Sequence, residues 1–369
     1  GVLLDSHRHP LAGPGGEALY ADIGRVGPAN AKKLLILVSG THGPEGYCGS
    51  GCHVGWLARR HFQQQAGTDT AVLFVHAINP WGFAHGRRVT EENVDLNRNF
   101  VDHAKPYPAN QPYDDLAEHI NPTDWTEESA KQHDAAIAAY HRKDGHDFMS
   151  KAVHGGQYVN PKGTFYGGNA PAWSNKTLRA ALAEHAARAD DLAIIDYHSG
   201  GGVWGFFDLF VDDSMAGGKT RDWFDAVTAI ADDKAAHGED AQSNTPGNLF
   251  YTPAEMFPDK RHTLCLTELR TGEHRTGLNA IRAENWAHHY DDPNSPFARN
   301  LAAKLQETFY PSRPEWKPMV LAQSNDCIAQ VLKIGLRSTG ACLGWFLYCQ
   351  MARPTTRQCG CSWLVGCRK

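Results

Sequence analysis

Four short apolar runs constrain the fold of this chain most, because each has the length of a buried strand and is bounded by polar or turn-forming residues. The runs are 33–39 (KLLILVS), 71–78 (AVLFVHAI), 191–197 (DLAIIDY) and 263–269 (TLCLTEL). Gly40 follows the first run, and a segment that begins as a glycine-rich turn and continues as a helix to about Arg60 separates it from the second. A strand, a helix and a second strand in this order predict a βαβ unit and a largely parallel sheet.

The remaining elements are less regular in sequence. Further strands are predicted at 17–25 and 204–210, and helices at 124–142, from Ser174 to about residue 188, and as two or three segments within 276–308. Residues 101–123 contain four prolines and no clear period, and are expected to form a long loop, as are residues 155–172. The chain therefore reads as an α/β protein with long loops.

Composition places the chain among ordinary globular proteins. Its 369 residues are 41% hydrophobic and 21% charged, which is enough apolar material for a core of one large domain or two smaller ones. The net charge of -5, without runs of like charge, gives no indication of a nucleic-acid partner or an anionic membrane surface. The opening GVLLDSHRHP does not resemble a signal peptide, and no apolar segment reaches ~18 residues, so no membrane partner is expected.

Cysteines divide the chain into two unequal parts. Only Cys48, Cys52 and Cys265 precede residue 327, which suggests a reduced, cytoplasmic main body. From about Arg337 the sequence becomes cysteine-rich without a helical or strand period. A zinc knuckle and a disulfide-linked tail are the alternatives for this segment, but the cysteine spacing does not form the two CxxC pairs of a structural zinc site. We expect a main domain over 1–336 and a poorly structured tail over 337–369.

His42 and Glu45 lie three residues apart in the turn that follows the first apolar run. A catalytic zinc needs three protein ligands and one open position, and a His-x-x-Glu pair entering a helix can direct both side chains at one ion. Taken alone the pair has a plain alternative, a surface histidine beside a helix-capping glutamate.

His198 and Glu268 strengthen the metal hypothesis, because they also lie at the ends of apolar runs. Ligands of open α/β sheets bind beyond the carboxyl ends of the strands, where these side chains would meet His42. His198 as a hydrogen-bonded core residue, and Glu268 as an ion-pair partner of Arg270, are the plain alternatives.

The segment NVDLNRNF, residues 93–100, follows the second run and carries Asn97 and Arg98, with Arg88 nearby. Arginine suits bidentate recognition of a carboxylate or stabilisation of an oxyanion. The alternative is a structural ion pair for Arg98 and a turn role for Asn97.

The segments HGPE (42–45), VDLNRNF (94–100), DYH (196–198) and TELRTG (267–272) together resemble the M14 metallocarboxypeptidase superfamily, which includes zinc carboxypeptidases and the succinylglutamate desuccinylase/aspartoacylase deacylases. SGTHGPEGYCGS, HAINPWGFAHGRRVTEENVDLNRNF and GQYVNPKGTFYGGNAPAWSN resemble more narrowly the DUF2817 proteins. The resemblance covers about residues 15–336. It implies a three-layer α/β/α fold with a mostly parallel mixed sheet.

The resemblance also implies roles for particular positions. By this comparison one Zn²⁺ per chain is held by the metal ligands His42, Glu45 and His198. The resemblance gives Glu268 the role of general base and acid, and Arg88 that of the group that polarises the scissile carbonyl. Asn97 and Arg98 correspond to the pair that binds a substrate carboxylate. Asp95 corresponds to the carboxylate behind His42, and Tyr251 is a candidate for the mobile tyrosine of the carboxypeptidases. The implied activity is hydrolysis of an amide bond, in a peptide or small-molecule substrate with a free carboxylate, by zinc-activated water.

Three other functions compete with this interpretation. Gly40, Gly43 and Gly46 form a GxxGxxG turn at the position of a phosphate-binding loop, but the GK[ST] sequence that reaches phosphates is missing. Ser199 precedes glycines, but the G-x-S-x-G elbow of serine hydrolases is absent. A non-catalytic zinc-binding or scaffold protein on the same fold is the main alternative.

Two questions stay open at the level of sequence. The choice between peptidase and N-acyl-amino-acid deacylase is one, since both act on substrates with a free carboxylate. The other is whether the aromatic residues of the loops wall the pocket or only pack: Tyr107, Tyr113, Tyr158, Phe165, Tyr166 and Trp173. His76, His85 and His154 lack partner spacing and are not expected to bind metal.

Overall fold

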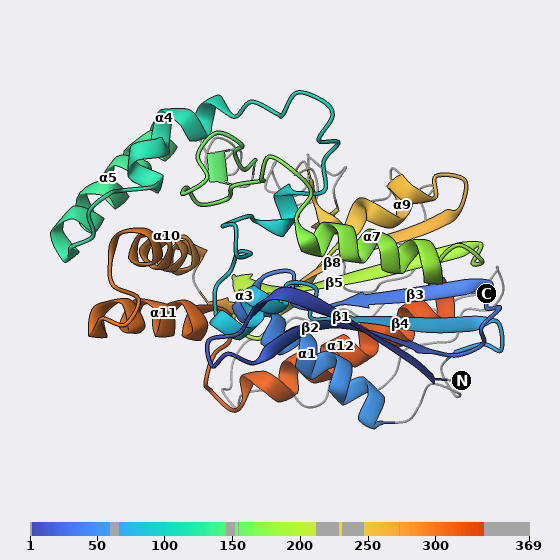
Figure 1. The fold of residues 1–369 in the computed structure, drawn as a ribbon. Helices are drawn as coiled ribbons and strands as arrows, with labels where there is room; N and C mark the ends of the chain where they lie inside the picture. Colours follow the sequence, from blue (N-terminus) through green and yellow to red (C-terminus); the bar gives the residue numbers. More distant parts are fainter. Residues whose placement is uncertain are drawn as a thin grey trace, which may run out of the picture. The chain divides into compact units, whose positions relative to one another are not determined.

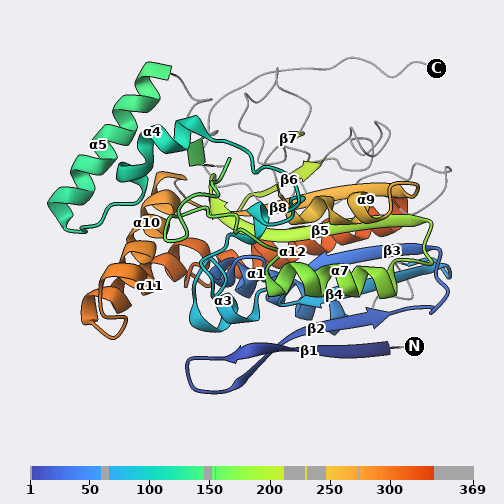
Figure 2. The same cartoon turned by 45° about the horizontal axis from the view of Figure 1, so that its top comes forward.

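A computed structural model describes residues 2–59, 66–144, 152–153, 155–211, 229–230, 247–272 and 274–335 (Figures 1 and 2). The cysteine-rich tail predicted over 337–369 and His154 lie outside the described residues. Among the described residues, no helix combines the length and apolar character that a membrane crossing requires.

One mixed sheet organises the described chain. Its strands, in spatial order, are β1 (Val2–Ala12), β2 (Ala18–Val26), β4 (Thr70–His76), β3 (Lys33–Val38), β5 (Asp191–Gly201), β8 (Arg261–Gly272), β6 (Phe207–Val211) and β7 (Ala229–Ile230). The central pairs β4–β3, β3–β5 and β5–β8 are parallel, whereas β1–β2, β2–β4 and β6–β8 are antiparallel. The predicted mostly parallel centre within a mixed sheet is confirmed.

Helices cover both faces of this sheet, as Figure 1 shows. The longer ones are α1 (Gly43–Ala58), α4 (Gln111–Ile120), α5 (Glu127–Asp144), α7 (Trp173–His185), α10 (His274–Tyr290), α11 (Pro296–Phe309) and α12 (Trp316–Gln330). The short ones are α3 (Pro80–His85), η1 (Leu96–Arg98), η4 (Leu249–Tyr251), α9 (Thr252–Met256) and η5 (Val331–Gly335).

Strand alternation divides the core into two layers. On β3, Ile36 packs in the cluster that includes residues of α7 and α9, while Leu35 and Leu37 pack in the cluster that includes residues of α1 and α12. Successive side chains of a strand point to opposite faces, so a strand that is apolar throughout must be covered twice. This explains the three-layer arrangement, which was predicted.

One sequence prediction of a single element was wrong. The segment expected to be a loop over 101–123 contains α4, which Asn110 caps by accepting a hydrogen bond from the Tyr113 amide. Tyr113, Leu116 and Ile120 are buried on one side of this helix, so helical spacing outweighed the surrounding prolines. The helix expected from Ser174 to about residue 188 is α7, which begins one residue earlier, with Ala172 as its N-cap.

The carboxyl ends of the central strands are covered by further helices. α10 and α11 lie beyond the end of β5, beside α4 and α5 in the view of Figure 1. This end of the sheet receives the turn from β3 into α1 and therefore holds the predicted site.

Candidate metal centre and its surroundings

His42 and Glu45 are placed by the sharp turn between β3 and α1. Gly40 has φ of 76°, and a Cβ there would lie 2.5 Å from the Cβ of Ala77, so the turn requires glycine. His42 is the N-cap of α1 by position but makes no side-chain capping bond, and Glu45 lies in the first turn. Both side chains are therefore left free of helix capping.

His198 and Glu268 are brought together by strand register. β5 and β8 run parallel, and His198 pairs directly with Glu268 across them. Residues opposite each other on neighbouring strands project to the same face, which explains why two side chains 70 positions apart become neighbours. Both lie within their strands rather than at the last residue, because β5 continues to Gly201 and β8 to Gly272.

The three predicted ligands form one buried cluster. One ligand atom from each of His42, Glu45 and His198 lies within 4.8 Å of the others, and the side chains are between 2% and 4% exposed. Nδ1 of His42 is 3.0 Å from Oε1 of Glu45, and Nδ1 of His198 is 2.8 Å from Oε2. The alternative of a surface histidine beside a capping glutamate is wrong, because both side chains are buried and neither caps the helix.

Each histidine has a second carboxylate on its far side. Nε2 of His42 is 2.9 Å from Oδ1 of Asp95, as the resemblance implied. Nε2 of His198 is 2.7 Å from Oδ2 of Asp196, a residue to which the sequence analysis assigned no role. The signal was present in the DYH segment, because residues two apart on a strand share a face.

Arg88 bridges the carboxylates around His42. Its guanidinium bonds to Asp95 and lies 3.6 Å from Oε1 of Glu45. Burial disfavours the charge of Asp95, but the positive charges of Arg88 and His42 outweigh burial and hold the pKa of Asp95 well below its usual range. Arg88 is thus held next to the cluster in its charged form.

Glu45 and Glu268 have opposite electrostatic environments. Burial opposes ionisation of Glu45, yet the charge of His42 and the hydrogen bond from His198 lower its pKa below the usual value. For Glu268 burial prevails and raises the pKa, although Arg270 and His198 oppose it. Two neighbouring carboxyls with pKa values shifted in opposite directions suit separate roles as ligand and proton carrier.

Glu268 is not held in a close ion pair with Arg270. The nearest contact, between Arg270 Nη1 and Glu268 Oε2, is 4.0 Å, and Arg270 instead bonds to Asp208 and to the Gly201 carbonyl. Oε2 of Glu268 is buried and has no hydrogen-bond partner among the described residues. An unsatisfied buried carboxylate oxygen is costly, which makes it a candidate contact for a bound water or substrate.

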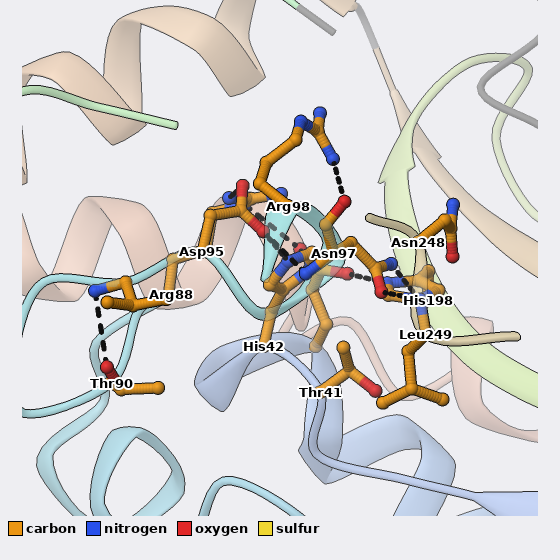
Figure 3. Close-up of polar contacts among 12 residues, drawn as sticks. Thr41, His42, Arg88, Thr90, Asp95, Asn97, Arg98, His198, Asn248 and Leu249 are labelled. Atoms are coloured by element: carbon orange, nitrogen blue, oxygen red, sulfur yellow. Dashed lines mark hydrogen bonds and ion pairs between the residues drawn. The ribbon is translucent and has the colours of Figure 1, made fainter. Parts of the chain in front are cut away.

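Asn97 and Arg98 lie in η1, beside the two histidines (Figure 3). Oδ1 of Asn97 accepts the Leu249 amide, and its Nδ2 is 3.1 Å from Nε2 of His198. Arg98 is buried and donates from Nη1 to the Asn97 carbonyl, while its Nε has no hydrogen-bond partner among the described residues. Arg98 therefore retains a free donor, whereas the amide of Asn97 is already engaged.

The remaining candidate residues have different surroundings. Tyr251 ends η4 and packs with Phe250 against the apolar core, ring centroids 4.2 Å apart, so a part in substrate binding stays a prediction. Ser199 donates its hydroxyl to the Phe309 carbonyl at 2.5 Å, which disfavours a nucleophilic role.

Four of the six loop aromatics form two groups. Tyr113 and Phe165 are buried within an apolar cluster, and Phe165 also borders the site, because Cζ of Arg88 lies over its ring, 5.5 Å from the centroid. Tyr107 and Tyr158 stack with centroids 4.6 Å apart, and the Tyr158 hydroxyl donates to the Arg98 carbonyl, so this pair supports η1.

The glycines of the β3–α1 turn have a packing role. A Cβ on Gly43 would lie 2.2 Å from the carbonyl oxygens of both Arg87 and Gly82, and the Gly43 amide already donates to the Arg88 carbonyl. The turn is thus packed against the backbone of residues 82–88, which disfavours the phosphate-loop alternative.

Gly43→Ala is accordingly expected to lower the free energy of unfolding by about 1–3 kcal/mol or more, because two backbone oxygens must move. Gly51→Ala in the same helix is the matched control, since a Cβ there meets nothing within 4 Å. It should be neutral or stabilising by up to ~1 kcal/mol. Chemical denaturation of both variants checks the pair, and equal midpoints would contradict the packing argument.

The fold and the cluster define an α/β protein with a candidate metal centre at the carboxyl ends of its central strands. The chain matches the model of the family described as "Protein of unknown function (DUF2817)" over residues 1–323. The protein belongs to this family, as the sequence analysis predicted. None of the curated protein sequences matches the chain.

Solved structures with a similar chain course have low sequence identity. An aspartoacylase family protein from Mesorhizobium loti is 17% identical with a TM-score of 0.36, over 78% of this chain and 66% of that one, just under two thirds of its length. Bovine thrombin-activatable fibrinolysis inhibitor, solved with tick carboxypeptidase inhibitor, is 11% identical with a TM-score of 0.41, over 89% and 91%. The succinylglutamate desuccinylase from Chromobacterium violaceum is 14% identical with a TM-score of 0.36, over 84% and 72%.

Proposed function

We propose that the protein is a zinc-dependent hydrolase that cleaves an amide bond, in a peptide or an N-acyl amino acid, next to a carboxylate-bearing group. The observation that carries the proposal is the buried His42–Glu45–His198 cluster with Glu268 in register beside it. Two imidazoles and one carboxylate, with room for a water, are the ligand set of catalytic zinc.

The residues present fit a zinc ion. Nδ1 of His42 is buried without a hydrogen-bond partner among the described residues, and it faces Glu45. A metal would satisfy this nitrogen, and the carboxylates on the opposite ring nitrogens would orient both imidazoles. Zinc is preferred over other divalent ions because of this nitrogen and oxygen donor set.

Bound zinc supplies a Lewis acid and lowers the pKa of a water to about 7. In the proposed reaction Glu268 accepts a proton from the attacking water and later donates it to the leaving amine. Its raised pKa brings it closer to the range in which a carboxyl both accepts and releases protons.

Two arginines have separate parts in this proposal. Arg88, which lies next to Glu45, donates to the oxygen of the scissile carbonyl as negative charge develops. Arg98 binds the free carboxylate of the substrate with its unused donor. Asn97 contributes to that pocket through its position in η1, although its amide contacts His198 and Leu249.

Metal analysis of the purified protein tests the proposal. We expect about one zinc per chain in the wild type, and loss of that zinc in His42→Ala because one of three ligands is removed. His85→Ala is the control: this histidine lies in α3, where it contacts the Ala12 carbonyl and stacks on Trp81. A wild type that takes up no zinc, even after addition, contradicts the proposal.

The alternative is a non-catalytic zinc-binding or scaffold protein. It also predicts zinc in the wild type and its loss in His42→Ala, so metal analysis does not separate the two. The Glu268 oxygen that accepts no hydrogen bond from the described residues favours the hydrolase, because a pure binding site does not need a proton carrier beside the metal.

A further inference from the structure

The carboxylate of Asp196 is buried and hydrogen-bonded in the site, and the proposed function gives it no role. It is fully buried, and both of its oxygens are engaged. Oδ2 is 2.7 Å from Nε2 of His198, and Oδ1 accepts the hydroxyl of Thr41 at 2.7 Å. Asp196 thus joins the middle of β5 to the residue that precedes His42.

We propose that Asp196 is a positioning residue that keeps the proton of neutral His198 on Nε2 and so leaves Nδ1 free to bind the metal. The inference rests on the proposed metal site. A neutral imidazole carries one N–H. Both ring nitrogens of His198 face carboxylates, since Nδ1 is 2.8 Å from Oε2 of Glu45 and Nε2 is 2.7 Å from Oδ2 of Asp196. Glu45 is itself a proposed ligand, so a bound metal would replace the proton between Nδ1 and Glu45, and the one N–H that the ring keeps would face Asp196.

A second polar group beside Nε2 of His198 shows why the position of the proton depends on the Asp196 carboxylate. Nδ2 of Asn97 lies 3.1 Å from Nε2 of His198. Its orientation is set, because Oδ1 of Asn97 accepts the Leu249 amide (Figure 3). An amide nitrogen donates, so without Asp196 the only polar group described next to Nε2 would favour a lone pair there and a proton on Nδ1. That tautomer cannot bind a metal through Nδ1.

Asp196→Asn is the isosteric test. The Thr41 hydroxyl donates to Oδ1, so the carboxamide oxygen is expected to take that place and its NH2 to face Nε2. Nε2 must then accept, and the ring proton moves to Nδ1. We expect the Kd for Zn²⁺ to rise about 10–100-fold, measured by competition with a chromophoric chelator. The visible absorption spectrum of the Co²⁺-substituted protein should change as well, because His198 is lost or displaced as a ligand.

Asp191→Asn is the matched control. Asp191 lies at the other end of the same strand and pairs with Arg261, remote from the cluster. It carries the same change of charge, so it should keep the wild-type zinc affinity and Co²⁺ spectrum. Thermal melting of the metal-free proteins shows whether each variant is folded.

A second substitution distinguishes proton placement from a general structural role. In Thr41→Val combined with Asp196→Asn, the hydroxyl donor is gone, so the carboxamide can turn and its oxygen can accept the Nε2–H. We expect the double variant to bind zinc more tightly than Asp196→Asn alone. A residue needed only for packing would not be rescued by removing a further hydrogen bond.

The outcomes separate the two proposals. If the wild type binds zinc and Asp196→Asn matches it in affinity and in Co²⁺ spectrum, the role of Asp196 is overturned while the proposed function stands. A double variant that binds no better than Asp196→Asn also overturns it. If the wild type itself binds no zinc, both proposals fail.

Discussion

Glu268→Gln is expected to lower kcat/KM for amide hydrolysis by about two to four orders of magnitude, the usual contribution of a positioned general base. Glutamine has the same shape but cannot accept the proton of the attacking water. The variant should still bind about one zinc per chain, because Glu268 is not among the three clustered ligands. Turnover of a panel of N-acyl amino acids and short peptides, measured with zinc content, checks both parts.

The control for this substitution is Glu255→Gln. Glu255 lies in α9, pairs with Arg179 and is 41% exposed, so neither zinc content nor turnover should change. A Glu268→Gln variant with wild-type turnover would show that another group carries the proton. If neither wild type nor variant hydrolyses any substrate while both bind zinc, the binding-protein alternative is favoured.

The central strands were predictable because both of their faces are buried, which makes their sequences apolar at nearly every position. Residues 33–38 and 191–197 are apolar with few interruptions, and only a strand covered on both faces or a buried helix has that pattern. β1 has no such pattern. Its sequence VLLDSHRHPLA is interrupted by five consecutive polar residues, and Leu4 is 68% exposed, because β1 is the edge strand of the sheet. A strand without a buried face at most positions leaves little trace in the sequence.

The proximity of His42 and Glu45 was predictable, because they are three residues apart in one turn. That His198 lies opposite Glu268 depends on the pairing of β5 with β8, which the two apolar runs do not specify. The orientation of Asn97 was not predictable, since it depends on the amide of Leu249, 152 residues away. The contact between Asp196 and His198 was predictable in principle, because residues two positions apart on a strand share a face. This spacing indicates a contact only if the segment is known to be a strand.

Under the proposed function, Arg98→Met is expected to remove a preference for substrates with a free carboxylate. Arg98 is buried, with Nε unpaired among the described residues, and burial lowers its pKa although Asp95 opposes this. A buried cation without a bonded anion is costly, and a substrate carboxylate would offset part of that cost through charge-assisted hydrogen bonds. Loss of one partner of such a pair costs about 2–5 kcal/mol, or roughly 30-fold to 5,000-fold in kcat/KM.

A comparison of two substrates separates this effect from misfolding. The wild type should prefer a carboxylate substrate strongly over the same compound with a carboxamide, and Arg98→Met should act on both at similar, low rates. Arg179→Met, which removes a half-exposed arginine of α7, should leave the preference unchanged. An undiminished preference in Arg98→Met would show that the carboxylate is bound elsewhere, and Arg88, the other arginine beside the cluster, would then be the group to substitute. General damage to the fold would lower both rates by the same factor, so only a change in their ratio supports a carboxylate at Arg98.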